Sequence, residues 1–271
     1  MSPLVTSQRM YAAVPGAARA WRALFERVFA DAAVEVRFLE HGWPQPIDAL
    51  WREPGLACAF MCGWPFSRQD RGMQPIAMPV PSPPRYQGLA RYCSEFLARD
   101  DTGWARLEDS FGHRIGWMAR DSQSGFNAPR AHLARFATRE RPALYRESRG
   151  PLGTPLRTLE ALRAGDVDVV ALDGFFLDLL RRHEPGLLAG IRCLDATPWA
   201  PIPLLVAAPD VDPAVVERLR AHLLALHDRP ECAPLLQDVI VECFTAPAPQ
   251  DYAEFDAMAE FAAERGYHDI R

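Results

Sequence analysis

Apolar residues along this chain follow two alternating patterns, which predict strands that alternate with helices. Continuous apolar runs, or apolar residues that alternate with polar ones, are typical of strands, and repeats of three or four positions are typical of helices. The predicted strands are residues 10–14, 34–38, 56–61, 92–99, 113–119, 167–172 and the proline-punctuated segment 197–208. The first predicted helix begins after Pro15-Gly16, and another begins at Gly174. The other predicted helices lie near residues 46–52, 104–110, 125–137, 154–164, 212–224 and 255–261.

This alternation predicts an α/β protein with mostly parallel sheets. The helix after Gly16 presents Trp21, Leu24, Phe25 and Val28 on one face, so we expect that face in a core. Proline clusters near 79–84 and 198–203 are the places where the chain is expected to cross between two lobes.

Composition narrows the possible functions. The chain has 271 residues, 49% of them hydrophobic and 24% charged, and a net charge of -5, so nothing indicates a nucleic-acid partner. All 30 basic residues are arginine, which excludes a Schiff-base lysine, a P-loop lysine and a lysine general base.

The cysteines and the N-terminal residues indicate the compartment in which the protein is expected. The six cysteines lack the two well-spaced pairs of a zinc ribbon, so no metal and no cofactor are expected, and reduced thiols are typical of a reducing compartment. The first 21 residues carry no apolar run of a secretory signal, and no run is long enough to predict membrane insertion. The chain as written is therefore expected in the cytoplasm, and in the periplasm if the true start lies upstream.

Polar residues that follow predicted strands are the candidate chemistry, because ligands of open α/β sheets gather at the carboxyl ends of strands. Residues 121–125, Asp-Ser-Gln-Ser-Gly, come after a strand and before a helix. The hydroxyls of Ser122 and Ser124 and the amides of Gly125 and Phe126 would suit an oxyanion at the helix start. The alternative is a plain helix cap in which Ser124 only closes the helix.

Three further residues are candidates, each with a structural alternative. Asp173 could accept a hydrogen bond from a ligand amine, or it could be a turn residue ahead of Gly174. Trp64 and Tyr92 could form an aromatic wall of a binding site, or they could be core residues. No local motif of a nucleophile with its base, a metalloprotease or a dinucleotide site is present, so no catalytic residue is predicted.

The middle of the chain resembles the phosphate, phosphite and phosphonate substrate-binding proteins of ABC transporters. The residues that carry the resemblance are Tyr92, Ser94, Arg99, Leu107-Glu108-Asp109, Gly112, Arg114, Asp121, Ser122, Ser124, Gly125, Pro129, Leu133 and the segment 164–180. Gln123 stands where the family has a threonine.

The resemblance implies a type II periplasmic-binding-protein fold, with two α/β lobes joined by a hinge and a ligand held between them. Lobe 1 is then expected to comprise residues 1–96 and 200–271, and lobe 2 residues 97–199. The implied ligand is a small anion held by Ser122, Gln123, Ser124, Gly125 and Phe126, with Asp173, Tyr92, Trp64 and Ser94 beside it, and the implied partner is an ABC permease.

Three functions remain open at this stage. The first is a solute-binding protein for a small oxyanion, linked to transport. The second is a biosynthetic enzyme on the same scaffold, against which the missing nucleophile–base pair counts. The third is an intracellular ligand sensor, which would need a partner because no DNA-binding segment is present.

Overall fold

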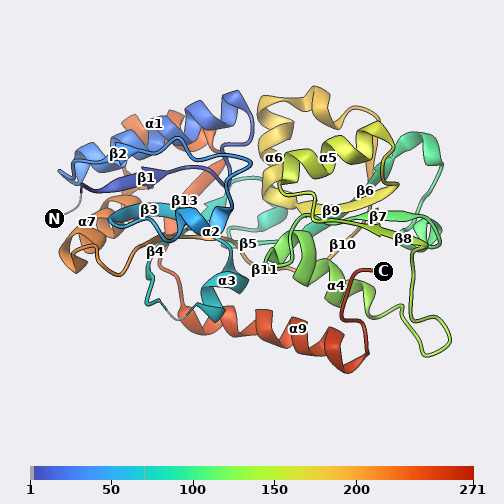
Figure 1. The fold of residues 1–271 in the computed structure, drawn as a ribbon. Helices are drawn as coiled ribbons and strands as arrows, with labels where there is room; N and C mark the ends of the chain where they lie inside the picture. Colours follow the sequence, from blue (N-terminus) through green and yellow to red (C-terminus); the bar gives the residue numbers. More distant parts are fainter. Residues whose placement is uncertain (1–2, 70) are drawn as a thin grey trace. The chain divides into compact units, whose positions relative to one another are not determined.

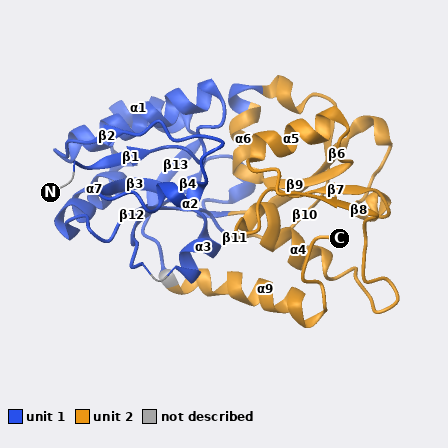
Figure 2. Ribbon diagram, in the orientation of Figure 1, with its two compact units in different colours: residues 1–91, 182–184, 201–249 blue, residues 92–181, 185–200, 250–271 orange. Residues whose placement is uncertain are grey.

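The computed structural model describes residues 3–69 and 71–271, which form two compact units (Figures 1 and 2). Unit 1 comprises residues 1–91, 182–184 and 201–249, and unit 2 comprises residues 92–181, 185–200 and 250–271. Each unit is an α/β structure with one main sheet. Among the described residues no helix is long and apolar enough to cross a membrane.

Unit 1 is built on a six-stranded sheet of mixed direction. Its strands, in spatial order, are β13 (Val241–Thr245), β4 (Gln74–Pro81), β12 (Leu204–Ala207), β3 (Leu56–Met61), β1 (Val5–Ser7) and β2 (Arg37–Phe38). β1 is parallel to β2 and to β3, and the remaining pairs are antiparallel. Its helices are α1 (Pro15–Asp31), α2 (Ile47–Leu50), α3 (Gly63–Arg68), α7 (Pro213–Leu224) and α8 (Ala233–Asp238).

The core of unit 1 confirms the predicted face of α1. Trp21, Leu24, Phe25 and Val28 are all buried. The Trp21 ring meets Phe60 of β3 edge to face, with 4.9 Å between ring centroids, and Tyr11 joins the same cluster. Such pairs add about 0.5–1.5 kcal/mol beyond their buried area, so the cluster fixes α1 on the strand that precedes α3.

Unit 2 is built on a five-stranded mixed sheet. In spatial order its strands are β10 (Ile191–Ala196), β6 (Ser94–Arg99), β9 (Val169–Asp173), β7 (Arg114–Gly116) and β8 (Glu147–Arg149). β7 is parallel to β8 and β9, whereas β6 is antiparallel to β9 and β10. Its helices are α4 (Ala128–Leu133), α5 (Pro155–Ala164), α6 (Gly174–His183, its end assigned to unit 1) and α9 (Glu254–Glu264).

Apart from residues 182–184, the chain passes from one unit to the other at 91/92, 200/201 and 249/250. At the first two of these crossings, the short strands β5 (Arg91–Tyr92) and β11 (Ala200–Pro201) form a two-stranded sheet. The second proline cluster therefore marks a crossing, but the first does not, because residues 79–81 belong to β4. The unit boundaries also differ from those expected at 96 and 200–271: residues 92–96 and 250–271 belong to unit 2. The C-terminal segment docks there because the Asn127 amide donates to the Phe255 carbonyl, at 2.9 Å.

Several sequence predictions were wrong at the level of single elements. Residues 10–14 form a turn and loop, and the first strand is β1. The predicted strand 113–119 is only Arg114–Gly116, and the sheets are mixed rather than mostly parallel. The strands β8, β10 and β13 were not predicted, because their exposed or short segments lack a clear apolar pattern. The strand β4 was not predicted either, because its prolines are typical of a loop. The strand 56–61 and the helix 155–164 with its Gly165 cap are confirmed.

An ion pair joins the two parallel strands that carry the candidate site. Asp168, just before β9, accepts from the Arg114 guanidinium at 2.7 and 2.9 Å and from the Arg114 backbone amide at 3.0 Å. Burial opposes ionisation of Asp168, but the bonds from Arg114 outweigh it and hold the pKa of this carboxyl below its ordinary value. The folded state therefore favours the ionised carboxylate.

We expect Asp168→Asn to lower the free energy of unfolding at pH 7 by about 2–3 kcal/mol, because hydrogen bonds to a charged group are lost. A depressed pKa contributes stability above the unfolded-state pKa that is lost as pH falls through the folded value. The difference between parent and variant in urea unfolding should therefore shrink below about pH 4. Glu26→Gln, in the exposed Arg22–Glu26 pair, is the control and should cost less than about 0.5 kcal/mol. A difference that stays constant from pH 7 to pH 3 would contradict this account.

Candidate functional site

One edge of the unit 2 sheet gathers most of the predicted site residues. β7 and β9 are parallel, so both end at this edge, and β6 begins there because it is antiparallel to β9. Ser94, the first residue of β6, pairs with Asp173, the last residue of β9. The segment after β7 contains a π-helix, Gln123–Asn127, which packs against β9. The fold therefore brings Ser94, Asp173 and residues 122–126 to a common edge.

Ser122 is the residue that caps this π-helix. Its hydroxyl oxygen accepts from the Gly125 amide at 2.9 Å, and its carbonyl accepts from the Asn127 amide at 2.9 Å. The helix begins at Gln123, two residues before the predicted start, and continues into α4. The Gly125 amide was expected to face a ligand, but the Ser122 hydroxyl occupies it. The cap is therefore formed by Ser122 rather than by Ser124.

Ser124 has the most available polar group of the segment. Its side chain is buried, with 6% of the residue exposed, and within the described part of the chain its hydroxyl has no hydrogen-bond partner. A hydroxyl without a protein partner is free to donate its hydrogen to a bound acceptor. Ser124 thus meets the chemical requirement for an anion donor better than its neighbours do.

Gln123 and Phe126 make contacts within unit 2. The Gln123 side-chain oxygen accepts from the Asn127 side-chain amide at 2.8 Å, and the Gln123 side-chain nitrogen lies 3.2 Å from the Met258 sulfur. The Phe126 ring meets Trp117 edge to face, with 5.3 Å between centroids. Both side chains are buried, so they fix the segment against α9 and the end of β7.

Gly125 is required by packing. An added Cβ would lie 2.6 Å from the Met118 Cβ and 3.0 Å from the Ser122 hydroxyl oxygen. The side chain of Met118 is therefore a packing reason for a glycine at this position.

The remaining predicted residues are positioned as follows. Asp173 is buried and one of its carboxylate oxygens accepts from the Phe175 and Phe176 amides at 2.8 and 3.0 Å, which caps α6. The Ser94 amide donates to the Thr197 hydroxyl at 2.9 Å, and Thr197 is a partner that sequence analysis did not single out. Tyr92 is buried in unit 2, and Trp64 is buried in α3 of unit 1 with the Arg68 guanidinium 5.2 Å from its ring.

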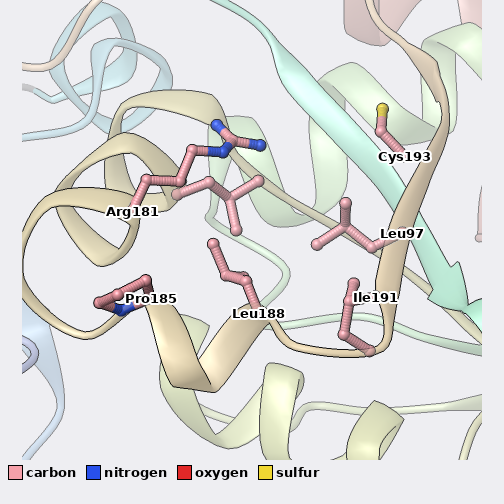
Figure 3. Close-up of a pocket in the computed structure, with 7 residues that line it drawn as sticks. Leu97, Arg181, Pro185, Leu188, Ile191 and Cys193 are labelled. Carbon is pink, nitrogen blue, oxygen red and sulfur yellow. The ribbon is translucent and has the colours of Figure 1, made fainter.

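A cavity of about 170 Å³ in unit 2 lies apart from these residues (Figure 3). Its lining is mostly aliphatic, from Leu97, Leu177, Pro185, Leu188 and Ile191, together with Arg181 and Cys193. The Arg181 guanidinium is already paired with Glu95 at 2.9 Å and Asp178 at 2.6 Å. This apolar cavity with a neutralised arginine does not suit an oxyanion.

No group of three or more His, Cys, Asp or Glu side chains that could hold a metal ion is present among residues 3–69 and 71–271. All six cysteines are free thiols.

Solved structures identify the fold class. The chain is similar to a binding protein component of an ABC phosphonate transporter from Pseudomonas aeruginosa, with a TM-score of 0.82 and 15% identity over 97% of this chain and 88% of that one. PhnD1 from Prochlorococcus marinus, in complex with methylphosphonate, gives a TM-score of 0.78 and 14% identity over 95% and 97%. XAC2383 from Xanthomonas citri, bound to ATP, gives 0.68 and 19% over 99% of both chains. The fold is thus that of type II periplasmic binding proteins.

A family model narrows this class. The model of the periplasmic substrate-binding proteins of ABC phosphonate transporters matches residues 58–252, and the chain belongs to this family. The match includes every predicted site residue. No curated protein sequence matches the chain.

We expect Gly125→Ala to lower the free energy of unfolding by about 1–3 kcal/mol, because the new methyl group overlaps Met118. Gly186→Ala is the matched control in the same unit, since nothing lies within 4 Å of its added Cβ. Thermal and urea unfolding of both variants provide the measurement. If Gly125→Ala proves as stable as the parent, packing is not the reason for this glycine.

Proposed function

We propose that this protein binds a small oxyanion of the phosphonate or phosphate class at the Ser122–Phe126 segment and delivers it to an ABC permease. The observation that carries the proposal is Ser124, a buried residue whose hydroxyl lacks a hydrogen-bond partner in the described chain. Family membership supports the ligand class, and so does the methylphosphonate bound to PhnD1.

The chemistry of the segment supports an anion rather than a cation. The first amides of a helix have no partner within the helix, and their partial positive charge favours an anion. The Ser122 hydroxyl accepts from the Gly125 amide and can still donate its own hydrogen. Together with the Ser124 hydroxyl, this gives two donors next to β9, without a lysine.

Asp173 has a separate part in the proposal. Its capping oxygen is engaged by two backbone amides, so the carboxylate is fixed at the sheet edge beside Ser94. A carboxylate in this position would repel a bare oxyanion and attract an amine on the same ligand. We therefore infer a preference for phosphonates that carry an amino group.

Transport and location belong to the same proposal. The family is periplasmic. The cytoplasmic location expected for the chain as written stays a prediction, and fractionation of cells that express the native gene tests it. Ligand-dependent stimulation of a reconstituted permease would test the transport partner.

We expect Ser124→Ala and Ser122→Ala to weaken binding of methylphosphonate about 10- to 150-fold each, the equivalent of about 1.5–3 kcal/mol for a hydrogen bond to a charged group. Isothermal titration calorimetry gives the affinities. Ser82→Ala, at an exposed serine of unit 1, is the control and should bind as the parent does. Thermal unfolding must accompany Ser122→Ala, because loss of its cap costs about 1 kcal/mol of stability. Unchanged affinity in both variants would overturn the proposed site.

We expect Asp173→Asn to weaken binding of 2-aminoethylphosphonate while leaving methylphosphonate affinity unchanged or improved. The substitution removes the negative charge but keeps an oxygen that can cap α6, so stability should change little. Titration of both ligands against parent and variant measures the difference. Equal losses for both ligands would show that Asp173 acts only through the structure of the segment.

A further inference from the structure

Arg9 lies at the carboxyl edge of the parallel strands of unit 1. β1 ends at Ser7, and β2 and β3 run parallel to it and end at the same edge (Figure 1). Arg9 follows β1 by two residues, and His41 follows β2 by three. Strand ends of this kind are where ligands of open α/β sheets bind. Sequence analysis placed the first strand at 10–14, which would have put Arg9 at the opposite edge.

Among the described residues, the partners of the Arg9 guanidinium are neutral groups. One nitrogen contacts Nδ1 of His41, and another donates to the Gln45 carbonyl at 2.5 Å. Across residues 3–69 and 71–271, no carboxylate forms an ion pair with Arg9. Other half-buried arginines of this protein, such as Arg114 and Arg229, bind carboxylates, so Arg9 differs from them.

Partial burial without an acidic partner among the described residues disfavours the charged form of the Arg9 guanidinium. Arg9 is half-buried, and burial lowers its pKa from the ordinary value. Burial and the nearby Arg9 charge lower the pKa of His41, with a smaller opposing effect from Glu53. His41 is thus neutral near pH 7, and its Nδ1 accepts from Arg9, since a guanidinium can only donate. An anion next to Arg9 would offset this cost, because a buried charge is stable only when it is paired.

The residue after Arg9 lies close to the start of α3. The sulfur of Met10 lies 4.0 Å from that of Cys62, the residue that precedes α3. Trp64, in the first turn of α3, has a buried indole Nε1 with no hydrogen-bond partner among the described residues. A guanidinium without an anion and an indole without an acceptor therefore both follow strands that end at one edge.

We propose that Arg9 binds an oxygen of an anionic ligand, a phosphonate, phosphate or carboxylate oxygen, at the carboxyl edge of the unit 1 sheet. The inference rests on the proposed function, because it takes the chemical class of the ligand from it. A guanidinium presents two parallel donors, which fit such an anion better than a lysine does.

Calorimetry with methylphosphonate and with inorganic phosphate tests the proposal. Arg9→Gln should weaken binding of whichever anion the parent binds about 10- to 150-fold, as expected for a lost charge-assisted hydrogen bond. Arg9→Lys should retain part of the affinity, because the charge remains but the paired donors are lost. Arg19→Gln, an exposed arginine on α1, is the control for the same change in net charge and should bind as the parent does.

The outcomes separate the two proposals. A parent that binds neither anion overturns the proposed function together with this inference. A parent that binds, with Arg9→Gln of equal affinity, overturns this inference alone. If Arg9→Gln does not fold, a crystal structure of the parent with methylphosphonate decides. An oxygen of the ligand within hydrogen-bond distance of the Arg9 guanidinium supports the proposal, and a ligand that leaves Arg9 uncontacted overturns it.

Discussion

The pairing of β9 with its two neighbours is the constraint on which the candidate site depends. β9 is buried along its whole length and pairs antiparallel with β6 and parallel with β7. These two directions bring the start of β6, the end of β9 and the segment after β7 to one edge. The Arg114–Asp168 pair fixes the parallel neighbour at the opposite end of β9, so a slip in register would break a charged contact as well as the sheet.

Most polar groups at that edge are already used by the protein. Ser122 caps the π-helix, Gln123 binds Asn127, and Asp173 caps α6. Each bond satisfies a group that would be costly to leave unpaired when buried. A ligand there must use what remains, which is the Ser124 hydroxyl, the hydrogen of Ser122 and the first amides of the helix. The groups that remain are hydrogen-bond donors.

Charge is distributed unevenly between the two candidate positions. The unit 2 segment offers neutral donors with a carboxylate nearby, whereas the unit 1 edge offers a guanidinium without a carboxylate. In a chain whose 30 basic residues are all arginine, most of the half-buried ones are bound to acidic side chains. Within residues 3–69 and 71–271, Arg9 is held instead by a histidine and a carbonyl.

The sequence by itself determined the α/β class, the buried face of α1, the strand 56–61 and the polar segment 121–125, because apolar periodicity and helix signals are local. The resemblance of residues 92–175 to a transport family then predicted the ligand class. Sequence patterns could not decide which serine caps the helix, because capping depends on where the π-helix begins. They also misplaced the first strand, because the short buried segment Val5–Ser7 gains its stability from β2 and β3 rather than from its own pattern. Only the tertiary structure placed Arg9 after a strand and the C-terminal helix in unit 2, because both depend on contacts between residues far apart in the chain.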